Sequence, residues 1–209
     1  MNRTPGNFGL YEGRREHDAC GIGVVVNISG RREHAIIERG RQVLLALHHR
    51  GAAGADETTG DGAGTLIQIP HEFFAAEADR LKFDLPAAGR YGVAVVFGPR
   101  EDAAARRALD NVLEEAVSHY GPRIVGWRDV PSDNACLGDL ARAAEPSVRQ
   151  AFIDGGGLED EALERRLYLA RKRAERLVRE RFGEAGEDFY VPSMSCRTVV
   201  YKGMFFAHQ

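Results

Sequence analysis

Apolar and polar residues follow two different periods along the chain, which predict a mixture of helices and strands. Apolar residues recur at helical spacing in four segments, so we expect helices at 34–48, 71–81, 102–119 and 159–182. Short β-branched or aromatic runs predict strands at 21–26, 65–69, 91–97, 124–127, 189–191 and 195–201. Residues 148–153 fit a strand or a helical turn equally well. Together these elements indicate an α+β architecture.

A polar leader and a glycine-dense segment interrupt this pattern. Residues 1–19 combine charges with Pro and Gly, which argue against regular structure, and the composition changes abruptly at Cys20. Residues 51–64 hold too many glycines for a helix and run into the predicted strand at 65–69. Pro70 ends that strand because it lacks the N–H that a ladder requires.

Composition and charge indicate a globular protein of one domain. The chain has 209 residues, 44% of them hydrophobic and 28% charged, and its net charge of −3 creates no general attraction for nucleic acid or an anionic membrane. It has no apolar run of transmembrane length, and residues 1–19 lack the apolar stretch of a secretory signal. We therefore expect a cytoplasmic protein with no membrane or nucleic-acid partner.

Cys20 is the first candidate for chemistry. It lies between the small residues Ala19 and Gly21, so a substrate could approach its thiol closely. Cleavage after Ala19 would place an α-amine with a pKa of about 8 beside a thiol with a pKa of about 8.5, close enough for the amine to take the thiol proton. A lone cysteine beside a strand is also commonly a buried apolar residue, and the pattern leaves both interpretations open.

Two arginines are further candidates. Arg50 precedes Gly51 at a predicted helix end, where a guanidinium suits a carboxylate ligand but also commonly caps a helix or faces solvent. Arg197 falls within the predicted strand 195–201, where burial would require an anion, either an internal carboxylate or a substrate.

Other kinds of site are disfavoured. The glycines at 60–64 lack the Gly-Lys-Ser/Thr end of a P-loop and precede a strand rather than a helix, which disfavours nucleotide binding. The histidines lack ligand-like spacing apart from the pair His48 and His49, and the three cysteines form no CxxC pair. No metal site is therefore expected.

Several short blocks of sequence occur in an order and spacing shared with a known family. They are residues 10–11, 16–23 (EHDACGIG), 49–52 (HRGA), 59–64 (TGDGAG), 68–74 (QIPHEFF) and 192–204 (PSMSCRTVVYKGM). Taken together, they resemble the N-terminal class II glutamine amidotransferase domain of glutamate synthase large subunits, over nearly the whole chain.

The resemblance implies a fold and a reaction. The fold is a four-layer αββα sandwich of the N-terminal-nucleophile hydrolase type, with residues 1–19 as a cleaved leader and 20–209 as the amidotransferase domain. Cys20 is implied as nucleophile and, through its own amine, as base; glutamine is hydrolysed to glutamate and ammonia through a cysteinyl thioester. Arg197 is implied to bind the α-carboxylate of L-glutamine, and Arg50 to line the active site.

The resemblance also implies what lies elsewhere. The oxyanion hole of the family uses an Asn-Gly pair after the arginine segment, and this chain has no Asn-Gly dipeptide. We therefore expect a C-terminally incomplete domain that is inactive in isolation. Its partners would be downstream synthase domains, which pass the ammonia to 2-oxoglutarate, and a small reductase subunit. No cofactor is expected within this segment; FMN, an iron–sulfur cluster and NAD(P)H or ferredoxin belong to the full-length enzyme.

Two alternatives remain open from the sequence. One is the glutaminase domain of another amidotransferase, serving asparagine, purine or amino-sugar synthesis. The other is a non-catalytic domain that binds an amino acid or a protein and retains residues 1–19, since a peptide bond at Cys20 removes the base.

Overall fold

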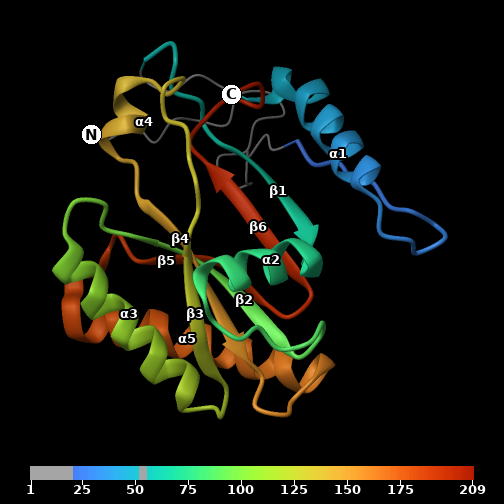
Figure 1. Cartoon of the computed structure of the whole chain (residues 1–209). Helices are drawn as coiled ribbons and strands as arrows, with labels where there is room; N and C mark the ends of the chain where they lie inside the picture. The colour runs from blue at the N-terminus through green and yellow to red at the C-terminus, as the bar shows by residue number, and fades with distance from the viewer. Residues whose placement is uncertain (1–20, 52–55) are drawn as a thin grey trace, which may run out of the picture.

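The computed structural model describes residues 21–51 and 56–209, and in these ranges it contains two antiparallel sheets and five α-helices (Figure 1). The helices are α1 His34–Ala46, α2 His71–Leu81, α3 Ala103–Ser118, α4 Asp139–Ala143 and α5 Asp160–Phe182, with 3₁₀ helices η1 His48–Arg50 and η2 Gly183–Gly186. The strands are β1 Ala63–Gln68, β2 Tyr91–Gly98, β3 Arg123–Asp129, β4 Ser147–Asp154, β5 Tyr190–Ser195 and β6 Thr198–Gly203. The architecture is therefore α+β, as predicted.

A four-stranded sheet in the order β3-β4-β2-β5 carries the larger core. The register places Ala94 of β2 opposite Ala151 of β4 on one side and Met194 of β5 on the other. These small and flexible side chains leave room for α3 and α5, which lie side by side over this face (Figure 1). Leu113 of α3 and Leu167 of α5 are both fully buried there. The amphipathic helices predicted at 102–119 and 159–182 are thus confirmed, because each has an apolar face with a matching sheet surface.

The second sheet is a two-stranded ladder of β1 and β6. It runs antiparallel from Ala63 opposite Gly203 to Gln68 opposite Thr198. Its Ile67 and Val199 pack into a smaller core with Phe74 of α2, on the other face of the four-stranded sheet. One side of the four-stranded sheet is therefore covered by two long helices, and the other by α2 and the ladder.

A chain of buried polar groups connects the two sheets. Arg128 of β3 donates from Nε to Glu77 Oε2 of α2 at 2.6 Å and from a terminal nitrogen to Gln150 Oε1 of β4 at 3.0 Å. Gln150 Nε2 donates in turn to the Tyr201 hydroxyl of β6 at 2.9 Å. Gln150 is fully buried and Arg128 is nearly so. The side chains of this chain, from Glu77 to Tyr201, therefore all have hydrogen-bond partners, as burial requires.

The strand predicted at 21–26 is wrong in this structure. These residues have no regular secondary structure, and Ile22 and Val24 are 85% and 81% exposed. The pattern was that of a buried strand, but a strand also requires neighbours that pair with its backbone, and the described part of the chain pairs none with it. The helix predicted at 34–48 does form as α1, yet none of its residues is fully buried.

The single strand predicted at 195–201 is interrupted by a turn. Ser195 ends β5, Thr198 begins β6, and Cys196 and Arg197 lie between them. At this corner the chain passes from one sheet into the other, so backbone amides lose their ladder partners. Serine hydroxyls replace them: Ser195 Oγ accepts from the amides of Arg197 at 3.0 Å and Thr198 at 3.2 Å. Ser193 Oγ similarly accepts from the amide of Val200 at 3.1 Å.

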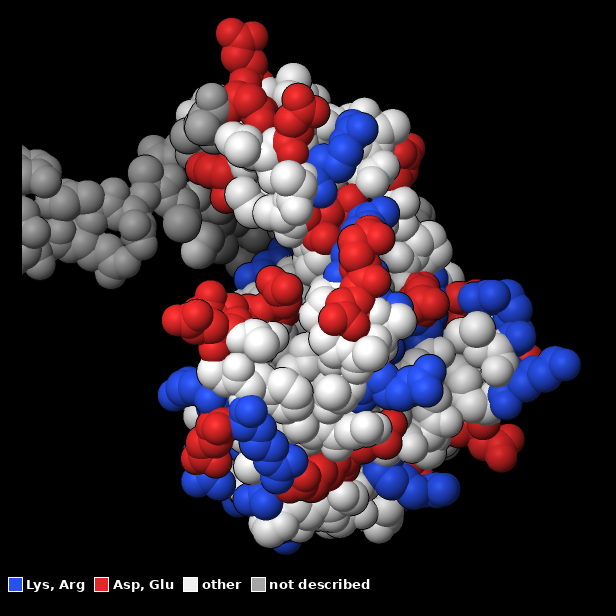
Figure 2. Space-filling view, turned by 90° about the vertical axis from the view of Figure 1, so that its left-hand side faces the viewer, with Lys and Arg blue, Asp and Glu red and all other residues white. Residues whose placement is uncertain are grey.

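The remaining elements match their predicted types. Residues 148–153, which fitted two interpretations, lie in β4, and α4 was not predicted. None of the helices in the described ranges is long and apolar enough to cross a membrane. On the face shown in Figure 2, Lys and Arg side chains are interspersed with Asp and Glu.

Candidate functional site

Only part of the predicted site falls where the structure is described. Cys20 lies outside the described residues, and so does the side chain of Arg50. The third predicted site residue, Arg197, is described in full, as are the neighbours Gly21 and Gly51. The surroundings of the predicted site are therefore described by the contacts of these neighbouring residues and of Arg197.

Gly23, in the described segment that follows Cys20, lies beside the end of α1. A Cβ placed on Gly23 would meet Val43 Cγ1 at 2.1 Å and Leu47 Cδ1 at 3.9 Å, so the backbone at Gly23 lies against the last turns of α1. A side chain at position 23 would push α1 away, which explains why glycine is needed there. Gly23 follows Cys20 by three positions, and Leu47 precedes Arg50 by three.

A polar hollow of about 390 Å³ lies at the Gly51 end of this arrangement. Its described lining comes from three parts of the chain: His48, His49, Gly51, Glu57, Thr58, Phe206, His208 and Gln209. The rings of Phe206 and His208 stack with centroids 5.4 Å apart, and the Nδ1 of His49 lies 3.0 Å from the carbonyl of Ala46. The volume lies within the range of small-molecule sites, and the lining offers both charge and hydrogen-bonding groups.

The glycine-rich loop forms one side of this hollow. Gly51 lies close to Asp61, since a Cβ on Gly51 would sit 3.3 Å from Asp61 Oδ1. Gly60 packs directly on the backbone of Phe205 and Phe206, within 2.6 Å of where its Cβ would be. The glycines therefore serve close approach of the backbone rather than phosphate binding.

Arg197 lies at the opposite end of the β1–β6 ladder. Its carbonyl accepts from the amide of Ile69 at 3.0 Å, just beyond the Gln68–Thr198 pair. Gly51 and Asp61 lie beyond the other end, and the ladder between spans about 17 Å at roughly 3.3 Å per residue. The side chain of Arg197 is exposed and forms no ion pair within the described ranges. The ladder thus separates the backbone of Arg197 from Gly51, and among the described residues no carboxylate pairs with Arg197.

Cys196, beside Arg197, has an environment that suppresses reactivity. Its amide donates to Glu164 Oε2 at 2.9 Å, and its thiol lies 3.1 Å from the same oxygen. Burial, and after it the Glu164 carboxylate, raises the pKa of the Cys196 thiol to about 12. A thiol in this state is a poor nucleophile at neutral pH. Cys136, by contrast, is exposed.

A larger and mainly apolar hollow, of about 640 Å³, lies near this corner between α5 and the two sheets. Leu66, Tyr168 and Val200 are among its lining residues, and Arg197 is not. Its apolar lining suits the polar ends of an amino acid less well than the hollow at Gly51. Among the described residues, no group of three or more His, Cys, Asp or Glu side chains is arranged to hold a metal ion.

Sequence reasoning missed the residues that fix the glycine-rich loop. Asp56 and Thr59 bind the loop to the start of α4, and Gln209 Nε2 donates to the carbonyl of Thr58 at 3.3 Å. A signal was present, because an aspartate followed at two and three positions by threonine is typical of an Asx turn.

Comparison with known proteins agrees with the sequence blocks. The family model of class-II glutamine amidotransferases matches residues 20–209. The NADPH glutamate synthase large chain of Bacillus subtilis is 41% identical over 212 residues, which cover 100% of this chain and 13% of the relative. The corresponding large chain of Azospirillum brasilense is 38% identical over 95% of this chain and 13% of its own length.

A third relative depends on a different electron donor. The ferredoxin-dependent glutamate synthase 2 of Synechocystis is 37% identical over 90% of this chain and 12% of the relative. The chain therefore spans only about one eighth of the length of these three proteins. Since the family model covers all but the first nineteen residues, the chain belongs to the class-II glutamine amidotransferases.

Proposed function

We propose that this chain is the glutaminase part of a glutamate synthase, which hydrolyses L-glutamine to glutamate and ammonia. The observation that carries the proposal is the family match from residue 20, which begins at Cys20 itself. The relatives named above are glutamate synthases, and their similarity extends over 90% or more of this chain. The ammonia would pass to 2-oxoglutarate in later domains of a longer protein, and a four-layer αββα arrangement would complete the fold.

Cys20 is the proposed nucleophile, with its own α-amine as base once residues 1–19 are removed. The amine takes the thiol proton, the sulfur forms a bond to the side-chain carbonyl carbon of glutamine, and the C–N bond breaks as ammonia leaves with a proton. Water then attacks the γ-glutamyl thioester, which releases glutamate and restores the thiol. No other residue is needed to supply the base in this scheme.

The hollow beside Gly51 is the proposed glutamine site. It is the more polar of the two hollows, its lining includes Gly51, which follows Arg50 in the sequence, and Gly23, three positions after Cys20, lies against the end of α1. Arg50 would contribute a guanidinium to the substrate there. The role of Arg197 in binding the α-carboxylate of glutamine stays a prediction, and so does the place of Arg50 in the active site.

The decisive experiment is substitution of the nucleophile in the full-length protein. Cys20→Ala is expected to lower ammonia release from glutamine by about a thousandfold or more, since it removes the attacking atom. Cys136→Ala is the matched control, because the Cys136 thiol is exposed and the substitution retains the backbone carbonyl that accepts from Gln209 of the hollow, so full activity is expected. N-terminal sequencing of the active protein should begin at Cys20. Undiminished glutaminase activity in Cys20→Ala would overturn the proposal.

A further inference from the structure

The carboxylate of Asp56 collects more hydrogen bonds than a surface turn needs. Its Oδ1 accepts from the amides of Thr58 at 3.1 Å and Thr59 at 2.6 Å. Its Oδ2 accepts from the Thr59 hydroxyl at 2.8 Å and from the amide of Leu140 at 3.2 Å, across 84 positions of sequence. A fifth bond comes from the Thr58 hydroxyl at 3.2 Å, so four of the five shape the local turn, and the bond from Leu140 joins that turn to α4.

Thr59, which is buried, also connects the loop to α4. Its side chain is only 2% exposed, and its hydroxyl accepts from the amide of Ala141 at 3.3 Å while donating to Asp56. Gly138, which precedes α4, allows the approach: a Cβ there would lie 2.4 Å from both Asp56 Oδ1 and Thr59 Oγ1. Asp56 and Thr59 thus form a clamp, which we call the Asp56–Thr59 clamp, between the loop and α4.

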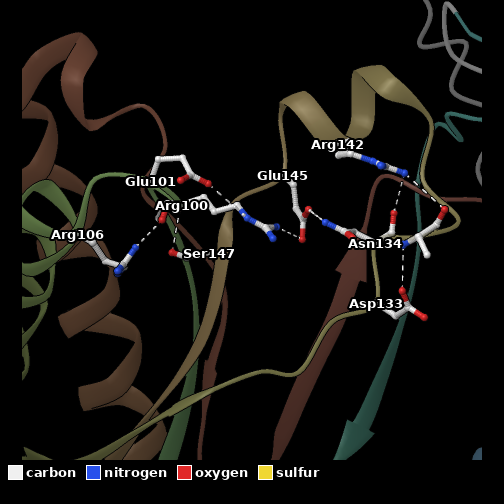
Figure 3. Close-up of polar contacts among 10 residues, drawn as sticks. Arg100, Glu101, Arg106, Asp133, Asn134, Arg142, Glu145 and Ser147 are labelled. Atoms are coloured by element: carbon white, nitrogen blue, oxygen red, sulfur yellow. Dashed lines mark hydrogen bonds and ion pairs between the residues drawn. The ribbon is translucent and has the colours of Figure 1, made fainter.

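The helix that receives this clamp is itself connected to the loops beside β2 and β4 (Figure 3). Arg142 of α4 donates to the carbonyls of Asn134 and Leu137 at 3.2 and 3.1 Å. The side-chain Nδ2 of Asn134 donates to Glu145 Oε2 at 2.9 Å, and Glu145 pairs with Arg100, which follows β2. Burial raises the pKa of Glu145, but the bonds from Asn134 and Arg100 outweigh it and the net shift is downward. The clamp therefore connects the loop to a charged network beside the ends of β2 and β4, two strands of the four-stranded sheet.

The clamped loop is also a wall of the polar hollow. Glu57 and Thr58, which lie between Asp56 and Thr59, line it directly. The carbonyl of Thr58 accepts from Gln209 Nε2, and Gln209 lines the hollow as well. A shift of the loop at Asp56 would therefore change the shape of the hollow, although Asp56 does not line it.

We propose that Asp56, together with the Thr59 hydroxyl, is a positioning residue for glutamine binding, which holds the Glu57–Thr58 wall of the hollow against α4. The inference rests on the proposed function of the hollow. It assigns Asp56 no contact with substrate. Its carboxylate is ionised at neutral pH, because the Thr59 hydroxyl first and then the backbone amides hold its pKa below its usual value.

Three substitutions test the clamp in the full-length protein. Thr59→Val keeps the shape of a buried side chain and removes the hydroxyl, whereas Thr59→Ser keeps the hydroxyl. Asp56→Asn keeps one acceptor oxygen but replaces the other by a donor that cannot serve Leu140. We expect Thr59→Val and Asp56→Asn to raise the KM for glutamine by about tenfold, as loss of a charge-assisted bond would, with kcat changed less than about twofold. Thr59→Ser should restore a KM near that of the unaltered protein.

The matched control is Asp133→Asn. Asp133 accepts from the amide of Ala135 at 3.0 Å in a similar turn and, within the described ranges, makes no side-chain bond to another loop. Its KM should not change. A purely structural role of the clamp would lower the melting temperature or the yield of active protein without moving KM.

The outcomes separate this inference from the proposed function. A KM within twofold of the unaltered value for both Thr59→Val and Asp56→Asn would overturn the clamp as a positioning device, even though ammonia release persists. If Asp56→Asn does not fold, the Thr59→Val and Thr59→Ser pair decides alone. Absence of any Cys20-dependent ammonia release in the unaltered protein would overturn the proposed function instead.

Discussion

The four-stranded sheet with α3 and α5 differs in packing from the N-terminal segment 21–49 with α1. The first region buries the faces of both long helices, and residues such as Leu113 and Leu167 are inaccessible to solvent. In the second region no residue from 21 to 49 is fully buried, and Ile22 and Val24 are almost fully exposed. Yet the second region carries the segments of Cys20 and Arg50. Stability and the proposed chemistry therefore reside in different parts of the molecule.

The difference matters because a weakly packed segment gains its position from what it touches. Gly23 lies against α1, and the glycine-rich loop is attached to α4 by the Asp56–Thr59 clamp. Through α4 this attachment reaches the rigid sheet. A site built on a loop is located by such contacts rather than by its own core.

The largest expected effect separates the two regions directly. Leu167→Ala in α5 removes a fully buried side chain and is expected to lower the free energy of unfolding by about 2–5 kcal/mol. Leu44→Ala in α1 makes the same chemical change at a half-buried position and should cost less than about 1 kcal/mol. Chemical denaturation of both variants measures the contrast. Equal losses would show that α1 is packed as tightly as α5, against the comparison.

A smaller effect is expected from the polar chain that joins the sheets. The bond from Arg80 first, and then that from Arg128, lowers the pKa of Glu77 to about 2 from its usual 4.5. A carboxyl with a depressed pKa in the folded state stabilises the protein above pH 4.5, and this contribution is lost as the pH falls from 4.5 toward 2. Glu77→Gln should flatten that part of the stability curve.

The control for this pH experiment is Glu101→Gln, at a side chain that is 94% exposed. The measurement is denaturant unfolding at a series of pH values. If the free energy of unfolding falls with pH below 4.5 as steeply in Glu77→Gln as in the unaltered protein, the chain Glu77–Arg128–Gln150 does not control acid stability.

The smallest expected effect lies at the corner where the chain passes between the sheets. Ser195→Ala removes the hydroxyl that accepts from the amides of Arg197 and Thr198. The free energy of unfolding should fall by about 1 kcal/mol, which is the usual net contribution of a hydrogen bond. Ser195→Thr, which keeps the hydroxyl, is the matched variant. Equal free energies of unfolding for Ser195→Ala and the unaltered protein would show that the bonds to the Ser195 hydroxyl do not stabilise the fold.

How far the sequence predicts the fold depends on whether a local pattern is sufficient. The helices at 102–119 and 159–182 were predicted because their apolar faces are long and regular, and the structure gives each a surface to cover. The strand at 21–26 failed because apolar, β-branched composition does not supply a pairing partner. The turn at Cys196 and Arg197 was hidden inside a run that reads as one strand. It depends on the hydroxyls of Ser195 and Ser193, which accept hydrogen bonds from the backbone amides of Arg197 and Val200.

The candidate site was predictable in its chemistry more than in its geometry. Cys20 and Arg50 were found from their neighbours and from a family resemblance, and both remain predictions. The separation of Arg197 from Gly51 follows from the register of β1 with β6, which no local pattern encodes. The role of Asp56 was missed because its decisive partner, Leu140, lies in a five-residue helix too short to show periodicity.

The pairing of β1 with β6 has a consequence for the order of folding. Ala63 and Gly203 are about 140 positions apart, whereas the strands of the larger sheet are closer in sequence to their partners β2 and β4. Closing so long a loop is entropically costly, and contacts of this kind form late. During synthesis, β1 must wait until β6 has left the ribosome. Its apolar residue Ile67, which packs beside Val199 of β6 in the folded protein, remains exposed until then, and exposed apolar surface makes such intermediates prone to aggregation.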